Sequence, residues 1–151
     1  MALGAKMADF GGWDMPIEYA GGGVIAEHTA VRERVGIFDV SHLGKAVVKG
    51  SGARDWVNSL FTNDLNKIQP PKAQYTMVID DATGGVVDDL IAYLKSDDEV
   101  FLIPNCANAA EVIRRMNEVK PDGIEVIDQH NDFGVIAVQG PKSGEVIEAL
   151  G

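Results

Sequence analysis

The chain of 151 residues is long enough for one domain, or two small ones, with a sizeable core, and its 46% hydrophobic and 24% charged residues are typical of a globular protein. Its formal net charge of -10 repels phosphate backbones and anionic membrane surfaces, and no apolar run is long enough to cross a bilayer. We therefore expect no nucleic-acid partner and no membrane association.

The start of the chain and its cysteine content favour a cytoplasmic protein without a metal site. Residues 1–6 have neither the basic-then-apolar layout of a secretion signal nor the arginine-rich layout of a transit peptide. The single cysteine, Cys106, excludes an internal disulfide and a cysteine-based metal site, which agrees with a reducing compartment.

The first third of the chain predicts one helix between irregular and extended segments. Residues 1–23 are rich in glycine and lack a regular period, so we expect an irregular lead-in. Apolar residues at helical spacing predict an amphipathic helix over residues 24–35. Short apolar runs predict strands at 37–40 and 45–49.

The middle of the chain predicts an antiparallel sheet with helices packed on one face. After a helix that ends near residue 61, two runs rich in β-branched and aromatic residues, 75–79 and 86–93, flank turn-forming residues and predict a hairpin. The elements expected next are a strand at 99–103, a helix at 107–119 and a strand at 124–127. This order predicts an α+β fold of ferredoxin-like type.

Two segments 90 residues apart share one plan. Residues 47–60 and 137–150 each read as an apolar strand, a polar residue, a glycine, and a helix opened by Ser or Pro. We therefore expect residues 135–150 to return beside the first 49 residues.

The second strand of the hairpin carries two adjacent acids, Asp88 and Asp89. Successive side chains of a strand point to opposite faces, so one carboxylate must lie among apolar neighbours, where it needs a partner. A carboxylate on a packing face is a candidate binding or acid/base group. The alternative is a bulge that leaves both acids solvated.

Familiar catalytic motifs are missing from the sequence. It contains no nucleophile elbow, HExxH, Cys/His cluster, P-loop or GxGxxG after a strand. Polar and aromatic groups at strand ends remain, namely Tyr75, Asp89, Tyr93 and Asn105. They suit a flat heteroaromatic ligand, because aromatic rings stack and a carboxylate binds ring N–H groups.

Motifs along the whole chain carry a family resemblance. They are Phe-Gly-Gly-Trp-Asp-Met-Pro (10–16), Glu-His-Thr-Ala-Val-Arg-Glu (27–33), Gly-Ile-Phe-Asp-Val-Ser-His-Leu-Gly (36–44), Thr-Asn-Asp (62–64), Lys-Ala-Gln-Tyr-Thr (72–76), Gly-Gly-Val-Val-Asp-Asp-Leu-Ile-Ala-Tyr (84–93) and Val-Gln-Gly-Pro (138–141). In these motifs the chain resembles the aminomethyltransferases (T-proteins) of the glycine cleavage system, within the tetrahydrofolate-binding family. The resemblance covers the N-terminal portion of that family, whose C-terminal domain has no counterpart in these residues.

The resemblance implies a domain plan and a site. A folate-binding domain at 50–128 would be inserted in a first domain made of 1–49 and 129–151. Asp89 would be the essential aspartate, and the residues lining the folate site would be Tyr75, Tyr93, Asn105 and Leu43, the last standing where a methionine is common. Combined with the alternation, this leads us to expect Asp89 inward, in a pocket shared with those tyrosines and Asn105, and Asp88 facing away.

The resemblance also implies a reaction of glycine catabolism. The methylene of an aminomethyl group, held on the lipoyl arm of a carrier protein, would pass to tetrahydrofolate as co-substrate with release of ammonia. Two alternatives remain: a truncated, non-catalytic folate-binding module, and a folate-dependent demethylase of the same family. Without a C-terminal domain to cover them, apolar faces would be exposed and the chain would self-associate.

Overall fold

The computed structural model describes residues 3–151, which form two units. One unit is the continuous segment Leu43–Phe133, called here the middle unit. The other, called the flanking unit, consists of the chain up to His42 and from Gly134 onward. The middle unit is wider than the range 50–128 expected for the inserted domain, because the strand that ends at Lys49 belongs to its sheet.

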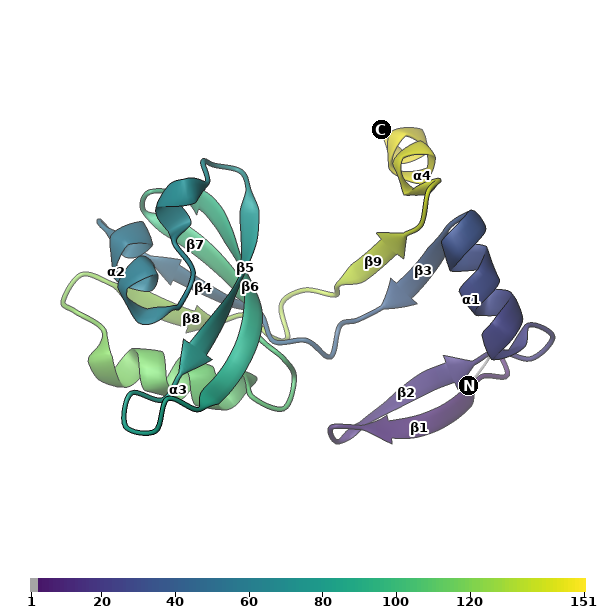
Figure 1. Cartoon of the computed structure of the whole chain (residues 1–151), viewed down its shortest axis with the longest axis horizontal. Coiled ribbons are helices and arrows are strands. Elements are labelled where there is room, and N and C mark those ends of the chain that lie inside the picture. Colours follow the sequence, from purple (N-terminus) through teal and green to yellow (C-terminus); the bar gives the residue numbers. More distant parts are fainter. Residues whose placement is uncertain (1–2) are drawn as a thin grey trace. The chain divides into compact units, whose positions relative to one another are not determined.

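A five-stranded antiparallel sheet forms the middle unit (Figure 1). Its strands are β4 (Ala46–Lys49), β5 (Ala73–Ile79), β6 (Val86–Ser96), β7 (Glu99–Ile103) and β8 (Glu125–Asp128), in the order β5-β6-β7-β4-β8. The other elements are α2 (Ala53–Leu60), a 3₁₀ turn η1 (Leu65–Lys67) and α3 (Ala109–Val119). Apart from β5, which adds one edge strand, the path β4-α2-β6-β7-α3-β8 has the strand and helix order of a split βαβ fold.

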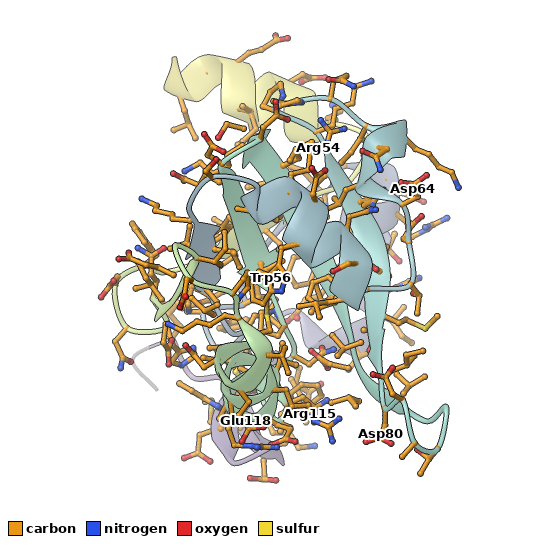
Figure 2. All side chains as sticks on the ribbon, turned by 90° about the vertical axis from the view of Figure 1, so that its left-hand side faces the viewer. Arg54, Trp56, Asp64, Asp80, Arg115 and Glu118 are labelled. Carbon is orange, nitrogen blue, oxygen red and sulfur yellow. The ribbon has the colours of Figure 1, made fainter. Side chains whose placement is uncertain are left out.

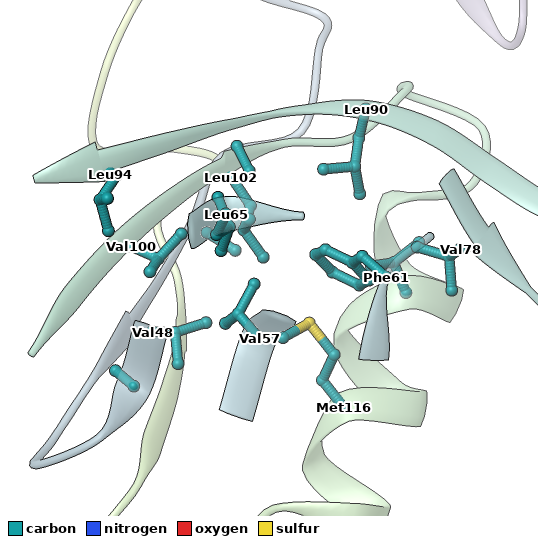
Figure 3. Packing of buried hydrophobic residues seen from close by; sticks show 14 of the residues in the cluster. Val48, Val57, Phe61, Leu65, Val78, Leu90, Leu94, Val100, Leu102 and Met116 are labelled. Carbon is teal, nitrogen blue, oxygen red and sulfur yellow. The ribbon is translucent and has the colours of Figure 1, made fainter. Parts of the chain in front are cut away.

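The core lies between one face of this sheet and the two helices. Leu90 and Leu94 of β6 alternate with more exposed neighbours and are at most 1% exposed. Val57 of α2 and Met116 of α3 meet them from the helix side (Figure 3). Both helices therefore cover the same face, and the opposite face of the sheet carries the half-exposed side chains of β6.

The turn between β5 and β6 is organised by Asp80. Its Oδ1 accepts hydrogen bonds from the backbone N–H groups of Ala82 and Thr83 and from the Thr83 hydroxyl. Its Oδ2 accepts one from Arg115 of α3 at 3.0 Å, and both labelled side chains are visible at the hairpin end in Figure 2. The turn is thus tied to the helix layer as well as to its own strands.

The outer edge of β5 is covered by the segment that follows α2. Phe61 forms an isolated bridge with Val78. Thr62 exchanges two hydrogen bonds with the backbone of Met77, one through its N–H and one through its hydroxyl oxygen. The Asn63 amide donates to the Tyr75 carbonyl at 2.7 Å. Backbone groups on this edge therefore have partners within the chain.

In the part of the flanking unit that the structure describes there are two separate two-stranded sheets and two helices. Its elements are β1 (Lys6–Phe10), β2 (Trp13–Glu18), α1 (Gly23–Glu33), β3 (Gly36–Asp39), β9 (Ile136–Gln139) and α4 (Ser143–Leu150). β1 pairs with β2 and β3 pairs with β9, both antiparallel. The segment after the middle unit therefore returns to the segment before it.

The irregular lead-in expected for residues 1–23 is wrong for the described part, which forms the β1–β2 hairpin. Gly11 and Gly12, at φ 61° and 87°, form its two-residue connection, a conformation that suits a tight hairpin and that glycine adopts without strain. The short alternation on either side of the two glycines was too weak a signal for strands.

Candidate functional site

Asp88 and Asp89 lie on opposite faces of β6, but not on the faces expected from the sequence. Asp88 is 2% exposed on the face covered by the helices, whereas Asp89 is exposed on the open face. The expectation that Asp89 faces inward and Asp88 away is therefore wrong. Alternation places the two acids on opposite faces of β6. Because β6 has apolar residues on both faces, its pattern does not identify the face that the helices cover.

The alternative of a bulge is confirmed only in part. The pairing of β5 with β6 shifts by one residue between Val78 and Ile79, next to the acidic pair. The bulge does not leave both acids in solvent, since Asp88 is buried.

Two neutral donors hold the Asp89 carboxylate. The Tyr75 hydroxyl donates to Oδ2 at 2.6 Å, and the Asn105 side-chain amide donates to Oδ1 at 3.1 Å. The same amide donates to the Asp89 carbonyl oxygen at 2.7 Å. The hydrogen bond to the carboxylate raises the pKa of the Tyr75 phenol, with smaller contributions from desolvation and from the negative charge. Asp89, Tyr75 and Asn105 thus form one hydrogen-bonded cluster.

Strand pairing explains how three distant segments meet at Asp89. Met77 of β5 is directly opposite Asp89, and Tyr75, two residues earlier, lies opposite Ile91 on the same face. On the other side, Ile91 pairs with Ile103, so two further residues bring the chain to Asn105, just beyond the end of β7.

Asp88 anchors the turn that carries Asn105. Its Oδ2 accepts the backbone N–H of Asn105 at 3.0 Å, and its Oδ1 accepts the side-chain amides of Asn105 and Asn108 at 3.0 and 2.8 Å. Neither Asp88 nor Asn108 was expected at the site. The spacing of two asparagines three residues apart before a helix is a signal that could have identified the turn.

Tyr93 and Leu43 are less directly connected to Asp89. Tyr93 lies on the open face of β6, 38% exposed, with its ring centroid 6.3 Å from that of Phe101. Leu43 is half-buried and precedes Gly44, whose N–H donates to the Pro104 carbonyl at 2.8 Å. This hydrogen bond ties the segment of Leu43 to the turn of Asn105.

A shallow pocket of about 580 Å³ lies beside Asp89 and Tyr75. Its lining residues are Thr62, Asn63, Tyr75, Thr76, Met77, Val86 and Asp89. Of the expected site residues, only Asp89 and Tyr75 line it. Thr62 and Asn63 belong to the Thr-Asn-Asp motif, and nothing in the sequence alone indicates a site role for them.

The cluster can bind and orient a polar heteroaromatic group. It presents a carboxylate as acceptor, held in place by a phenol and an amide, beside a pocket with apolar side chains. Within residues 3–151 no group of three or more His, Cys, Asp or Glu side chains is placed to hold a metal ion. None of the helices described for this chain combines the length and apolar character needed to span a bilayer.

Comparisons with known proteins give one consistent result. The family model of the GCVT N-terminal domain matches residues 1–151. The chain is 62% identical over 149 residues to the aminomethyltransferase of Parafrankia sp. (strain EAN1pec), covering 99% of this chain and 40% of that protein. It is 54% identical over 149 residues to the aminomethyltransferase of Mycobacterium tuberculosis (strain CDC 1551 / Oshkosh), again covering 99% and 40%.

A solved structure agrees with these relatives. The crystal structure of glycine cleavage system aminomethyltransferase T from Bartonella henselae matches with a TM-score of 0.89 and 27% sequence identity, over 98% of this chain and 40% of that one. This chain therefore spans about two-fifths of the length of its relatives. The resemblance read from the motifs is confirmed, and the chain belongs to the GCVT N-terminal domain family, the N-terminal part of the glycine cleavage aminomethyltransferases.

Proposed function

We propose that this chain supplies the tetrahydrofolate site of an aminomethyltransferase of glycine cleavage, with Asp89 as its catalytic residue. The observation that carries the proposal is the Asp89 carboxylate, exposed on an open sheet face and held by Tyr75 at 2.6 Å and Asn105 at 3.1 Å. The middle unit would be the inserted, ferredoxin-like folate-binding domain, and the flanking unit the first domain around it.

The open face suits a flat ring system with N–H groups. Tyr75 and Tyr93 expose 59% and 38% of their surface on this side, so their rings are accessible for stacking. Each oxygen of Asp89 has one donor in the described contacts, which leaves lone pairs for N–H groups of a ligand. The pocket of about 580 Å³ beside Asp89 and Tyr75 is within the usual size range of small-molecule sites.

The role proposed for Asp89 is to orient the folate nitrogens and to accept a proton as nitrogen attacks the methylene carbon. In the transfer, the methylene carbon loses its bonds to the amino nitrogen and to the lipoyl sulfur and gains bonds to two folate nitrogens. The two protons displaced from those nitrogens end on ammonia and on the thiol. A carboxylate beside the nitrogens contributes positioning and acid/base catalysis to these steps.

The partners proposed for this activity are tetrahydrofolate and a lipoylated carrier protein that holds the aminomethyl group. Because the chain spans 40% of its relatives, the remaining length of such a protein would supply further contacts to both. A second candidate is a folate-binding module without turnover.

Calorimetric titration of this chain with tetrahydrofolate tests the binding part. Transfer from the aminomethyl-lipoyl carrier tests turnover, measured for this chain alone and for the chain joined to the C-terminal part of the Parafrankia relative. We expect Asp89→Asn to reduce turnover about 10²- to 10⁴-fold, the range of a lost acid/base group, and to weaken binding only about threefold to tenfold.

The control is Asp81→Asn, which removes an exposed carboxylate from the hairpin turn and should change neither quantity. If the chain binds tetrahydrofolate but shows no turnover, either alone or joined to the C-terminal part of the relative, the folate-binding module without turnover is the better candidate. Turnover with a methylated amine but not with the lipoyl carrier would indicate the demethylase. Full turnover of Asp89→Asn would remove Asp89 from the catalytic role.

A further inference from the structure

Asp88 is buried, ionisable and not used by the proposed chemistry. It is 2% exposed on the helix-covered face of β6, next to the exposed Asp89. A carboxylate in such a place is costly unless hydrogen bonds compensate for the lost hydration. Three N–H groups do so, and all three come from the turn between β7 and α3.

This turn is shaped around the Asp88 carboxylate. The Asn105 carbonyl accepts the backbone N–H groups of Asn108 and Ala109 at 3.0 and 2.9 Å, which closes the turn at the start of α3. Asn108 occupies the N-cap position, yet its side chain makes no capping hydrogen bond and donates to Asp88 instead. Both asparagine side chains of the turn are thus directed at one carboxylate.

The Asn105 amide connects the two acids across β6. Its Nδ2 lies 3.0 Å from Asp88 Oδ1, 3.1 Å from Asp89 Oδ1 and 2.7 Å from the Asp89 carbonyl oxygen. An amide nitrogen carries two protons, so it shares them among these three acceptors. An ionised carboxylate only accepts hydrogen bonds, so Asp88 requires the nitrogen of the Asn105 amide, and not its oxygen, on this side.

We propose that Asp88 is a positioning residue of the transfer site: its buried carboxylate fixes the Asn105 amide in the orientation that lets Nδ2 hold the Asp89 carboxylate. The effect on transfer rests on the proposed function, whereas the effect on Asn105 does not. Asp88→Asn keeps the size of the side chain but turns one acceptor into an NH₂ donor that faces N–H donors of the turn. The turn then has to shift, and Asn105 loses its contact with Asp89.

The first measurement is solvent exchange of the Asn105 Nδ2 protons by ¹⁵N NMR in the whole chain. In the unaltered chain these protons should be protected, and in Asp88→Asn their exchange should be at least about tenfold faster. Val112→Ala is the matched control: it truncates a buried core residue of α3, 1% exposed, and destabilises the unit without removing a hydrogen bond of the polar turn, because the backbone bond from Val112 to the Asn108 carbonyl stays. Asn105 should remain protected in that variant when the protein is folded.

The second measurement is a double-mutant cycle of Asp88→Asn and Asn105→Ala, read by the Kd for tetrahydrofolate. If Asp88 acts through Asn105, each change weakens binding about fivefold and both together also about fivefold, not the roughly 25-fold product. Independent effects, or unchanged protection of Asn105 in folded Asp88→Asn, would overturn the proposal. If Asp88→Asn does not fold, free exchange of the Asn105 amide in the unaltered chain would overturn it equally. Absence of folate binding by the unaltered chain would count against the proposed function, and the exchange data would still decide the role of Asp88.

Discussion

Tyr75 reaches Asp89 diagonally across two antiparallel strands: its hydroxyl lies 2.6 Å from Asp89 Oδ2 although its direct partner in the pairing is Ile91. Diagonal neighbours on one face of a sheet are too far apart for short side chains but within reach of an aromatic ring. The contact therefore depends on the length of tyrosine and on the register of the hairpin.

The Tyr75 phenol should titrate above its ordinary pKa of 10.0, because its hydroxyl donates to Asp89 and because the negative charges of Asp89 and Asp88 oppose formation of a phenolate. In Asp89→Asn its pKa should fall toward 10.0. Phenolate absorbance measures this titration. Subtracting the titration of Tyr75→Phe leaves the signal of Tyr75 alone among the three tyrosines. An unchanged titration in Asp89→Asn would mean that the hydrogen bond is not formed in solution.

Tyr75→Phe should weaken tetrahydrofolate binding by about fivefold, since it removes one hydrogen bond to a charged but solvent-accessible group and keeps the ring. Tyr19→Phe, in the flanking unit, is the matched loss of a hydroxyl and should leave the Kd unchanged. Equal affinities of Tyr75→Phe and the unaltered chain would restrict Tyr75 to a stacking role.

Acid should destabilise the middle unit through its Arg–carboxylate pairs. Hydrogen bonds from Arg114 and Arg115 lower the pKa of Glu111 from 4.5 to about 2, and a hydrogen bond from Arg115 lowers the pKa of Asp80. These pKa values are lowered only in the folded state. As the pH falls, the unfolded chain therefore takes up protons at a higher pH than the folded protein does. The stabilisation is therefore complete above pH 4.5 and is lost as the pH falls from there toward about 2.

Urea unfolding of the middle unit between pH 7 and pH 3, followed by Trp56 fluorescence in a Trp13→Phe background, measures this loss. Glu111→Gln should give a shallower dependence on pH, because one of the linked carboxylates is gone. A pH dependence as steep as that of the unaltered chain would show that the loss of stability does not come from the ion pairs of Glu111.

Leu102→Ala should lower the free energy of unfolding of the middle unit by about 2–5 kcal/mol, because Leu102 is fully buried between sheet and helices. Val119→Ala, on the last turn of α3 and 59% exposed, should change it by less than about 0.5 kcal/mol. Comparable losses for the two variants would show that the core does not lie where the alternation of β7 indicates.

The flanking unit should drive self-association of this chain. No residue of α1 or α4 is buried, and Ile25, Ile37 and Leu150 expose 84%, 74% and 78% of their surface. We expect sedimentation velocity to show species larger than a monomer at high concentration, and Ile25→Ser to shift the distribution toward monomer. A clean monomer at every concentration would contradict this.

Much of the middle unit could be predicted from the sequence because local signals agree there. The turn residues between Ile79 and Val86, the alternation in β6, and the helical stripe of Val112 and Met116 each indicate one structure. The β1–β2 hairpin could not be recognised, because each of its strands is too short to show a period and its glycines also suit an irregular segment.

At the candidate site, the orientation expected for the two acids is wrong, whereas the role expected for the residues around Asp89 stays a prediction. Tyr75, Asp89 and Asn105 do meet, but which of Asp88 and Asp89 is buried depends on which face the helices cover, and that is a tertiary property. The hydrogen bonds of Asp88 depend on the path of the turn after β7, which alternation within one strand does not describe.

The covered edge of β5 also restricts how another protein could dock beside Asp89. Thr62 and Asn63 occupy backbone groups of Met77 and Tyr75 that an incoming peptide would need in order to add a strand. β-Augmentation, which relies on a free row of N–H and C=O groups, is therefore excluded at the edge nearest Asp89. A protein that docks at this edge would have to be recognised by side chains, through shape and charge, and could leave again without breaking a sheet.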